Sequence, residues 1–165
     1  MPDKDERNLE KVYHSAVAGL YARLKSNYDF IYSKYGDEGI KLIADMSRDY
    51  GYSIAERARK RLSRCDIASV AQYILRIFNT VTRGTTNNVR LCKENDHRIV
   101  ISVTECPLHF TVPEMCLAHT EMEKMVVEGL NPALGYRIGK SIPAGDSFCE
   151  HIIERISSET GINRE

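Results

Sequence analysis

The amino-acid sequence predicts an α+β fold in which three N-terminal helices precede a ββαββ antiparallel sheet. Hydrophobic residues recur every three to four positions before Gly84 and shift toward every two positions after it. Two turn-like sequences, Asn95-Asp96-His97 and Pro143-Ala144-Gly145-Asp146, divide the second half into two hairpins separated by a helix. At 165 residues the chain is expected to form a single domain, 1–165, with a helical region at 1–83 and a ββαββ region at 84–165.

Three amphipathic helices are expected in the first half. The first spans about 6–35, where apolar residues form one stripe. The second spans about 37–63, and Gly51 is a position at which it could break. The third follows Asp66, which is a typical N-cap residue, and presents a wide apolar face between Ile67 and Val81.

Four strands and a fourth helix are expected in the second half. The strands are predicted at 88–94, 98–105, 134–142 and 147–156. The helix is predicted to begin at Thr111, which forms a capping box with Glu114, and to end at Gly129. Packing two hairpins and a helix together buries one face of a single sheet.

Composition excludes several functional classes. The formal net charge is zero, which is unlike the basic footprint of a nucleic-acid-binding protein. No run of apolar residues is long enough to span a membrane, and the polar first residues do not resemble an export signal. Five scattered cysteines, an odd number, favour free thiols in a reducing cytoplasm over a disulfide framework.

Strand alternation predicts one apolar and one mixed face for the sheet. Ile99, Ile101 and Val103 are assigned to the apolar face together with the apolar positions of the last strand, Phe148, Ile152 and Ile156. Cys149 and His151 alternate with those positions, so they are assigned to the mixed face along with the arginines. That face is either a pocket wall or the solvent side of the sheet.

Cysteines and histidines form the candidate chemical site. Cys116 and His119 are three positions apart on one side of the predicted helix, and Glu123 extends that stripe. With Cys106 and Cys149 they make up a Cys3His set that could hold zinc, although the spacing is also compatible with buried packing thiols. Cys106 precedes a helix and lies three positions from His109, so a catalytic thiolate is a further alternative.

The order of short motifs in the second half resembles a known family. Cys106-Pro107 is followed by Cys116, by Asn131-Pro132 and by Gly145-Asp146 with Cys149 three residues later. This series, across about 66–156, resembles the L-2-amino-thiazoline-4-carboxylic acid hydrolase family. The same hairpin-helix-hairpin plan also resembles small-molecule-binding domains of the 4-vinyl-reductase type.

The first resemblance implies a hydrolase that opens the ring of a small heterocyclic amino acid. It implies a nucleophile or metal ligand, a proton donor and a cation for the substrate carboxylate. The candidates are Cys106 or Cys149 for the first role, His109, His119 or Asp146 for the second, and Arg137 or Arg90 for the third. Asp146 also has a plain role as a turn residue.

The second resemblance implies a domain that binds a small molecule without turnover, in some cases with structural zinc. Under either reading, the N-terminal helices could form a lid over the pocket or the interface of a homodimer.

Overall fold

The computed structural model describes residues 4–82 and 88–156, and it confirms the α+β class. Gly84, where the hydrophobic period was predicted to change, lies outside these residues. The elements follow in the order α1 (Lys4–Tyr35), α2 (Asp37–Arg59), α3 (Ile67–Val81), β1 (Val89–Asn95), β2 (Arg98–Val103), α4 (Pro113–Leu130), β3 (Leu134–Ile138), the 3-10 turn η1 (Ile142–Ala144) and β4 (Cys149–Arg155).

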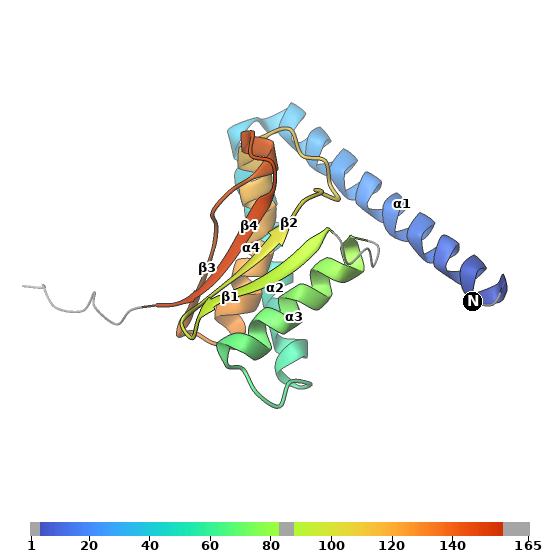
Figure 1. Cartoon of the computed structure of the whole chain (residues 1–165). Helices are drawn as coiled ribbons and strands as arrows, with labels where there is room; N and C mark the ends of the chain where they lie inside the picture. The colour runs from blue at the N-terminus through green and yellow to red at the C-terminus, as the bar shows by residue number, and fades with distance from the viewer. Residues whose placement is uncertain (1–3, 83–87, 157–165) are drawn as a thin grey trace, which may run out of the picture.

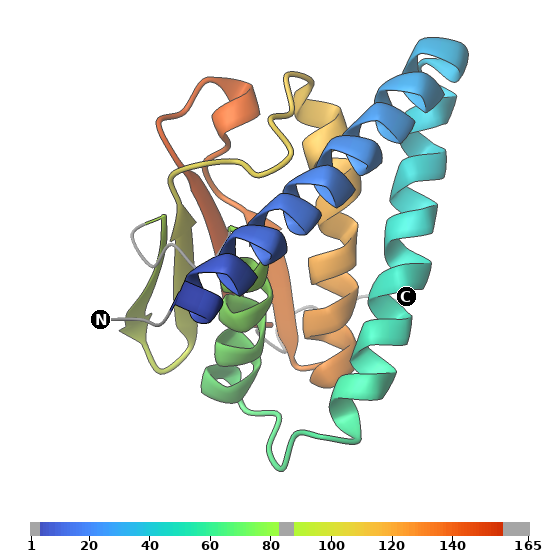
Figure 2. The same cartoon turned by 90° about the vertical axis from the view of Figure 1, so that its right-hand side faces the viewer.

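The four strands form one antiparallel sheet in the order β1-β2-β4-β3. Helices α3 and α4 pack on one face of this sheet, α2 packs on α4, and α1 packs on α2 (Figures 1 and 2). Helix α1 runs diagonally across the helical layer in Figure 2. The hydroxyl of Tyr13 on α1 donates to the carbonyl of Thr80 at the end of α3 over 3.1 Å, which ties the two helices together.

The cross-strand register corrects the predicted sheet faces. Ile101 pairs with His151, and Val103 pairs with Cys149. Directly opposed residues point to the same side of a sheet, so Cys149 and His151 lie on the face that α3 and α4 cover. Their predicted assignment to the mixed face was wrong. Alternation along one strand shows which of its residues share a face. Only the pairing with a neighbouring strand shows which of the two faces is buried.

Helix α2 is continuous through Gly51, where a break had been considered. A Cβ atom at Gly51 would lie 2.5 Å from the carbonyl oxygen of Met122 and 2.8 Å from Cβ of Met125. The missing side chain therefore allows α2 and α4 to approach closely. The end of α2 lies at Arg59, four residues before the predicted end at residue 63.

The predicted helix starts were right at α3 and wrong at α4. Asp66 is the N-cap of α3, and its Oδ1 accepts a hydrogen bond of 2.9 Å from the amide of Ser69. At α4 the N-cap is Val112, and no side chain caps the helix, so the capping box at Thr111 does not form. Pro113 occupies the first helical turn as expected, and the helix ends at Leu130.

The second hairpin has a longer connection than predicted. Strand β3 ends at Ile138, and β4 begins at Cys149 rather than at residue 147. Between them lies η1, and its C-cap is Gly145, whose φ of 101° lies in the left-handed region that glycine adopts readily. The thiol of Cys149 is thereby placed next to η1.

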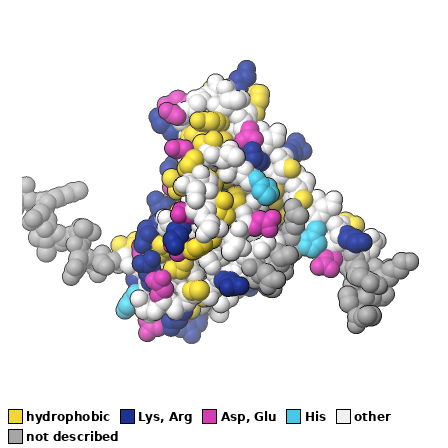
Figure 3. Space-filling model, turned by 45° about the horizontal axis from the view of Figure 1, so that its top comes forward, with side chains coloured by type: hydrophobic (Ala, Val, Ile, Leu, Met, Phe, Trp, Pro, Cys, Tyr) yellow, Lys and Arg dark blue, Asp and Glu magenta, His cyan; other side chains and the backbone are white. Residues whose placement is uncertain are grey.

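The surface combines charged and apolar areas. On the face drawn in Figure 3, acidic and basic side chains are interspersed with hydrophobic ones. Leu42, Met46 and Tyr50 form an exposed stripe along α2, with 49%, 53% and 57% of their surface accessible. The homodimer through the N-terminal helices stays a prediction. No helix in the described part of the chain is long and apolar enough to cross a membrane.

Candidate functional site

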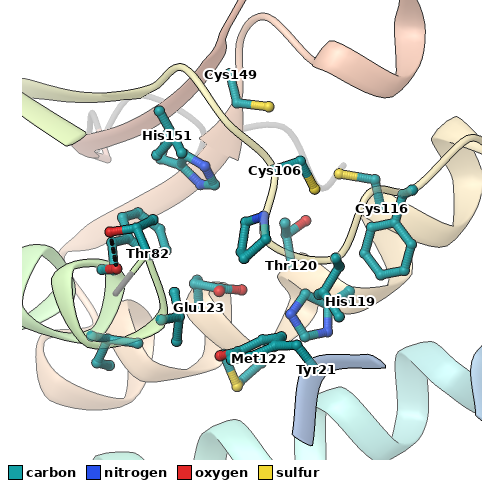
Figure 4. Close-up of a pocket in the computed structure, with 17 residues that line it drawn as sticks. Tyr21, Thr82, Cys106, Cys116, His119, Thr120, Met122, Glu123, Cys149 and His151 are labelled. Carbon is teal, nitrogen blue, oxygen red and sulfur yellow. Dashed lines mark hydrogen bonds between the residues drawn. The ribbon is translucent and has the colours of Figure 1, made fainter. Parts of the chain in front are cut away.

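A cavity of about 80 Å³ lies between the sheet and the helices. Strands β2 and β4, helices α1, α3 and α4, and the β2–α4 connection all contribute to its wall (Figure 4). Most of the wall is apolar, formed by Ile77, Phe78, Val81, Val103, Pro107, Leu108, Phe110 and Met122. No Lys or Arg occurs among the described residues that line it.

Three of the predicted site residues, Cys106, Cys116 and Cys149, line this cavity. Figure 4 shows the thiols of Cys106 and Cys116 pointing toward each other. Burial raises the pKa of Cys116 to about 12 and also raises the pKa of Cys149. The amide of Ile142 donates to the Cys149 sulfur over 3.3 Å. At neutral pH, Cys116 and Cys149 are therefore protonated thiols and weak nucleophiles.

His119 also lines the cavity, on α4. Its Nδ1 is 3.3 Å from the Tyr28 hydroxyl, and its ring contacts the rings of Tyr28 and Phe110 edge-on. Burial lowers the pKa of His119 to about 4, so the imidazole is neutral at pH 7.

The predicted zinc set is not assembled. Across residues 4–82 and 88–156, no group of three or more His, Cys, Asp or Glu side chains is arranged to hold a metal ion. The four predicted ligands share one cavity wall, but His119 is engaged with aromatic rings and Cys149 with the backbone of η1.

Two other predicted catalytic residues lie outside the cavity. His109 is exposed, has a φ of 48°, and lines an adjoining groove beside α1. Its amide donates to the carbonyl of Cys106 over 3.2 Å. Asp146 is exposed, and its Oδ2 accepts from the amide of Ser141 over 2.8 Å. Asp146 therefore holds the turn, which is the plain role considered for it.

Both predicted carboxylate-binding arginines lie on the opposite face of the sheet. Arg137 is opposite Ile152 in the ladder, and its Nε donates to Glu154 over 2.7 Å. Arg90 is exposed and is opposite Ser102. These positions alternate with those that face α3 and α4, so neither guanidinium faces the cavity.

Two polar residues that had not been predicted as site residues also line the cavity. Glu123 is only 4% exposed, and its Oε2 has no hydrogen-bond partner among the described residues. Burial raises its pKa to about 7. The sequence placed Glu123 in one stripe with Cys116 and His119, and that stripe was the signal that could have identified it.

His151 is the second such residue, and it lies at the floor of the cavity on β4. Its Nδ1 is 2.5 Å from the hydroxyl oxygen of Tyr136, and its ring centroid is 4.4 Å from that of Phe78. Burial lowers the pKa of His151 to about 3. The imidazole is a neutral, hydrogen-bonded part of the wall.

Of the comparisons with known proteins, the one with solved structures gives matches. No protein-family model and no curated protein matches the chain. Solved structures do match, among them a trafficking protein particle complex subunit 3 from Naegleria fowleri covalently bound to palmitic acid. That chain is 14% identical, with a TM-score of 0.57, and the alignment covers 94% of this chain and 99% of the other. At this identity the likeness shows a shared fold and nothing more.

Proposed function

We propose that this protein is a ligand-binding domain that holds a small, largely apolar molecule in the cavity between α3, α4 and the sheet. The observation that carries the proposal is the cavity wall, which is mostly aliphatic and aromatic with a few buried polar groups. Ligand sites commonly have this combination of an apolar surface and a small number of placed polar atoms.

The fold likeness supports an elongated apolar ligand in particular. The structure from Naegleria fowleri is described as bound to palmitic acid, whose long alkyl chain requires an apolar channel. In this chain, Phe78, Val103, Leu108 and Phe110 offer such a surface. We propose that Cys116 and Cys149 contact this ligand without forming a covalent bond, because both are protonated thiols at neutral pH.

Calorimetric titration with methyl decanoate tests this function. The ester has an alkyl chain and no charge, so its binding reports on the apolar cavity alone. Val81 is partly buried at the end of α3 and lines the cavity, so Val81→Trp should fill space there and weaken binding at least tenfold. Ile156→Trp, at an exposed position after β4, is the matched control. Absence of binding by the wild type, or equal binding by Val81→Trp, would overturn the proposal.

A second candidate is the hydrolase that the motif order suggested. Its support is that Cys106, Cys149 and Glu123 line one cavity, so a thiol and a carboxyl group that changes protonation near neutral pH are close to the same space. Turnover of 2-amino-thiazoline-4-carboxylate by the wild type, lost in Cys106→Ala, would favour this candidate. No turnover together with binding of methyl decanoate would favour the ligand-binding domain.

A further inference from the structure

Glu123 is the feature of the cavity that a purely apolar ligand does not explain. It lies in the middle of α4, one turn after His119, and its side chain points into the cavity in Figure 4. Only 4% of the Glu123 surface is exposed, yet Oε2 has no hydrogen-bond partner among the described residues. A buried carboxyl oxygen without a partner destabilises the fold, because it has lost its hydrogen bonds to water without replacing them.

A core position of this kind is ordinarily filled by an apolar side chain or by a carboxylate with a partner. The nearby polar atoms with identified bonds pair elsewhere: the Thr120 hydroxyl donates to the carbonyl of Leu117, Nδ1 of His151 is bonded to Tyr136, and Nδ1 of His119 is bonded to Tyr28. A ligand group is therefore well placed to supply the missing donor.

We propose that the ligand of this cavity carries a hydrogen-bond-donating head group, an aliphatic amine or hydroxyl, which donates to Oε2 of Glu123 while its apolar body lies against α3 and the β2–α4 connection. This inference rests on the proposed function and narrows its ligand class. A free carboxylate head is disfavoured, because the described part of the cavity wall contains no Lys or Arg to pair with that anion. The wall also contributes a carboxyl group of its own, that of Glu123.

The titratable groups around Glu123 are consistent with a ligand head group that donates a hydrogen bond. They are Tyr21 and Tyr28 from α1, Cys116 and His119 from α4, Cys106 from the β2–α4 connection, Cys149 and His151 from β4, and Tyr136 from β3. None of those with a resolved pKa shift is charged at pH 7, because burial raises the pKa of the three tyrosines and of Cys116 and Cys149 and lowers that of both histidines. An ammonium head would thus find one acidic partner in apolar surroundings, which strengthens the pair.

The test compares four ligands with the same alkyl chain: decylamine, 1-decanol, methyl decanoate and decanoate. Each is titrated into the wild type at pH 8, below the concentration at which it self-associates. The amine and the alcohol should bind at least tenfold more tightly than decanoate, since a hydrogen bond to a charged group contributes about 1.5–3 kcal/mol.

Two variants separate a direct contact from a structural effect. Glu123→Gln keeps an acceptor oxygen without the charge, so it should retain decanol binding and lose the preference for decylamine. Glu123→Leu removes the acceptor, so both should fall to the level of methyl decanoate. Circular dichroism and thermal melting establish that each variant is folded before titration.

The outcomes distinguish this inference from the proposed function. Methyl decanoate binding that depends on Val81, with decanoate as tight as decylamine, would overturn the donor head and leave the apolar-ligand function in place. A preference for amine that persists in Glu123→Leu would also overturn it. Failure of all four ligands to bind would overturn the proposed function itself.

Discussion

The hydroxyl oxygen of Tyr136 on β3 lies 2.5 Å from Nδ1 of His151 on β4, and both side chains are buried. The bond crosses two neighbouring strands at the floor of the cavity and satisfies two polar groups that burial has removed from water. It holds the imidazole ring against Phe78, which is part of the cavity wall.

Tyr136→Phe should therefore lower the free energy of unfolding by about 1–3 kcal/mol, because it leaves a buried imidazole nitrogen without its partner. Urea denaturation followed by circular dichroism measures the change. Tyr52→Phe removes a hydroxyl from a residue that is 55% exposed and should change stability by less than about 0.5 kcal/mol. Equal effects of the two substitutions would contradict the role given to the bond.

Gly51→Ala should destabilise the protein by about 1–3 kcal/mol, because its new methyl group would overlap the backbone of α4 at Met122. Gly19→Ala is the matched control. Gly19 lies within α1 and has open space around the position of a Cβ atom, so alanine there should stabilise the helix by about 0.5–1 kcal/mol. Opposite signs for the two glycines are the expected result, and equal signs would argue against the tight α2–α4 contact.

Glu123 makes stability depend on pH. Burial raises its pKa from 4.5 to about 7, so the folded state holds a proton that the unfolded state releases between these values. This contribution to stability is fully present below pH 4.5 and is lost as the pH rises through 7. His119 and His151 have lowered pKa values, so their contribution is present above pH 6.5 and is lost as the pH falls.

Comparison of Glu123→Gln with the wild type removes the two histidine contributions, because both proteins share them. From pH 4.5 to pH 8, the stability of the variant relative to the wild type should rise by roughly 3 kcal/mol, at 1.36 kcal/mol for each unit of pKa shift. Glu114→Gln, on the exposed side of the same helix, is the control. A difference that stays flat across this range would show that Glu123 is not held in a buried environment.

Arg137→Ala should leave binding of the alkyl ligands unchanged, because the side chain lies on the opposite face of the sheet from the cavity. Its ion pair with Glu154 is half exposed and should contribute no more than about 1 kcal/mol to stability. Calorimetry with decanoate and with methyl decanoate checks the first point. Loss of decanoate binding alone would restore Arg137 as a carboxylate-binding residue.

Local signals in the sequence were sufficient for the elements of the fold. The apolar stripes predicted the helices, and the Asp66 cap predicted where α3 begins. The start of α4 was harder, because Thr111 and Glu114 match a capping box, whereas the backbone turns into the helix one residue later at Val112. Such ends depend on how the preceding connection packs against the core, and no local pattern contains that information.

The composition of the site could be predicted only in part. Cys106, Cys116, His119 and Cys149, which had been grouped into one candidate zinc set, line one cavity. Which face Cys149 and His151 take depends on the register of β4 against β2, which is a long-range relationship that alternation leaves open. Glu123 was visible as a member of the Cys116 stripe, but its lack of a partner is a property of the folded packing.

Methyl NMR of methionine tests most directly whether the alkyl ligand binds inside the cavity. Met122 lines both the cavity and an adjoining groove between α1, α2 and α4, whereas Met46 is 53% exposed and lines the groove but not the cavity. With ¹³C-methyl-labelled methionine, addition of methyl decanoate should shift the Met122 signal and leave the Met46 signal in place, and Val81→Trp should suppress the shift. A titration in which Met122 does not respond, or in which Met46 also shifts, would contradict binding inside the cavity.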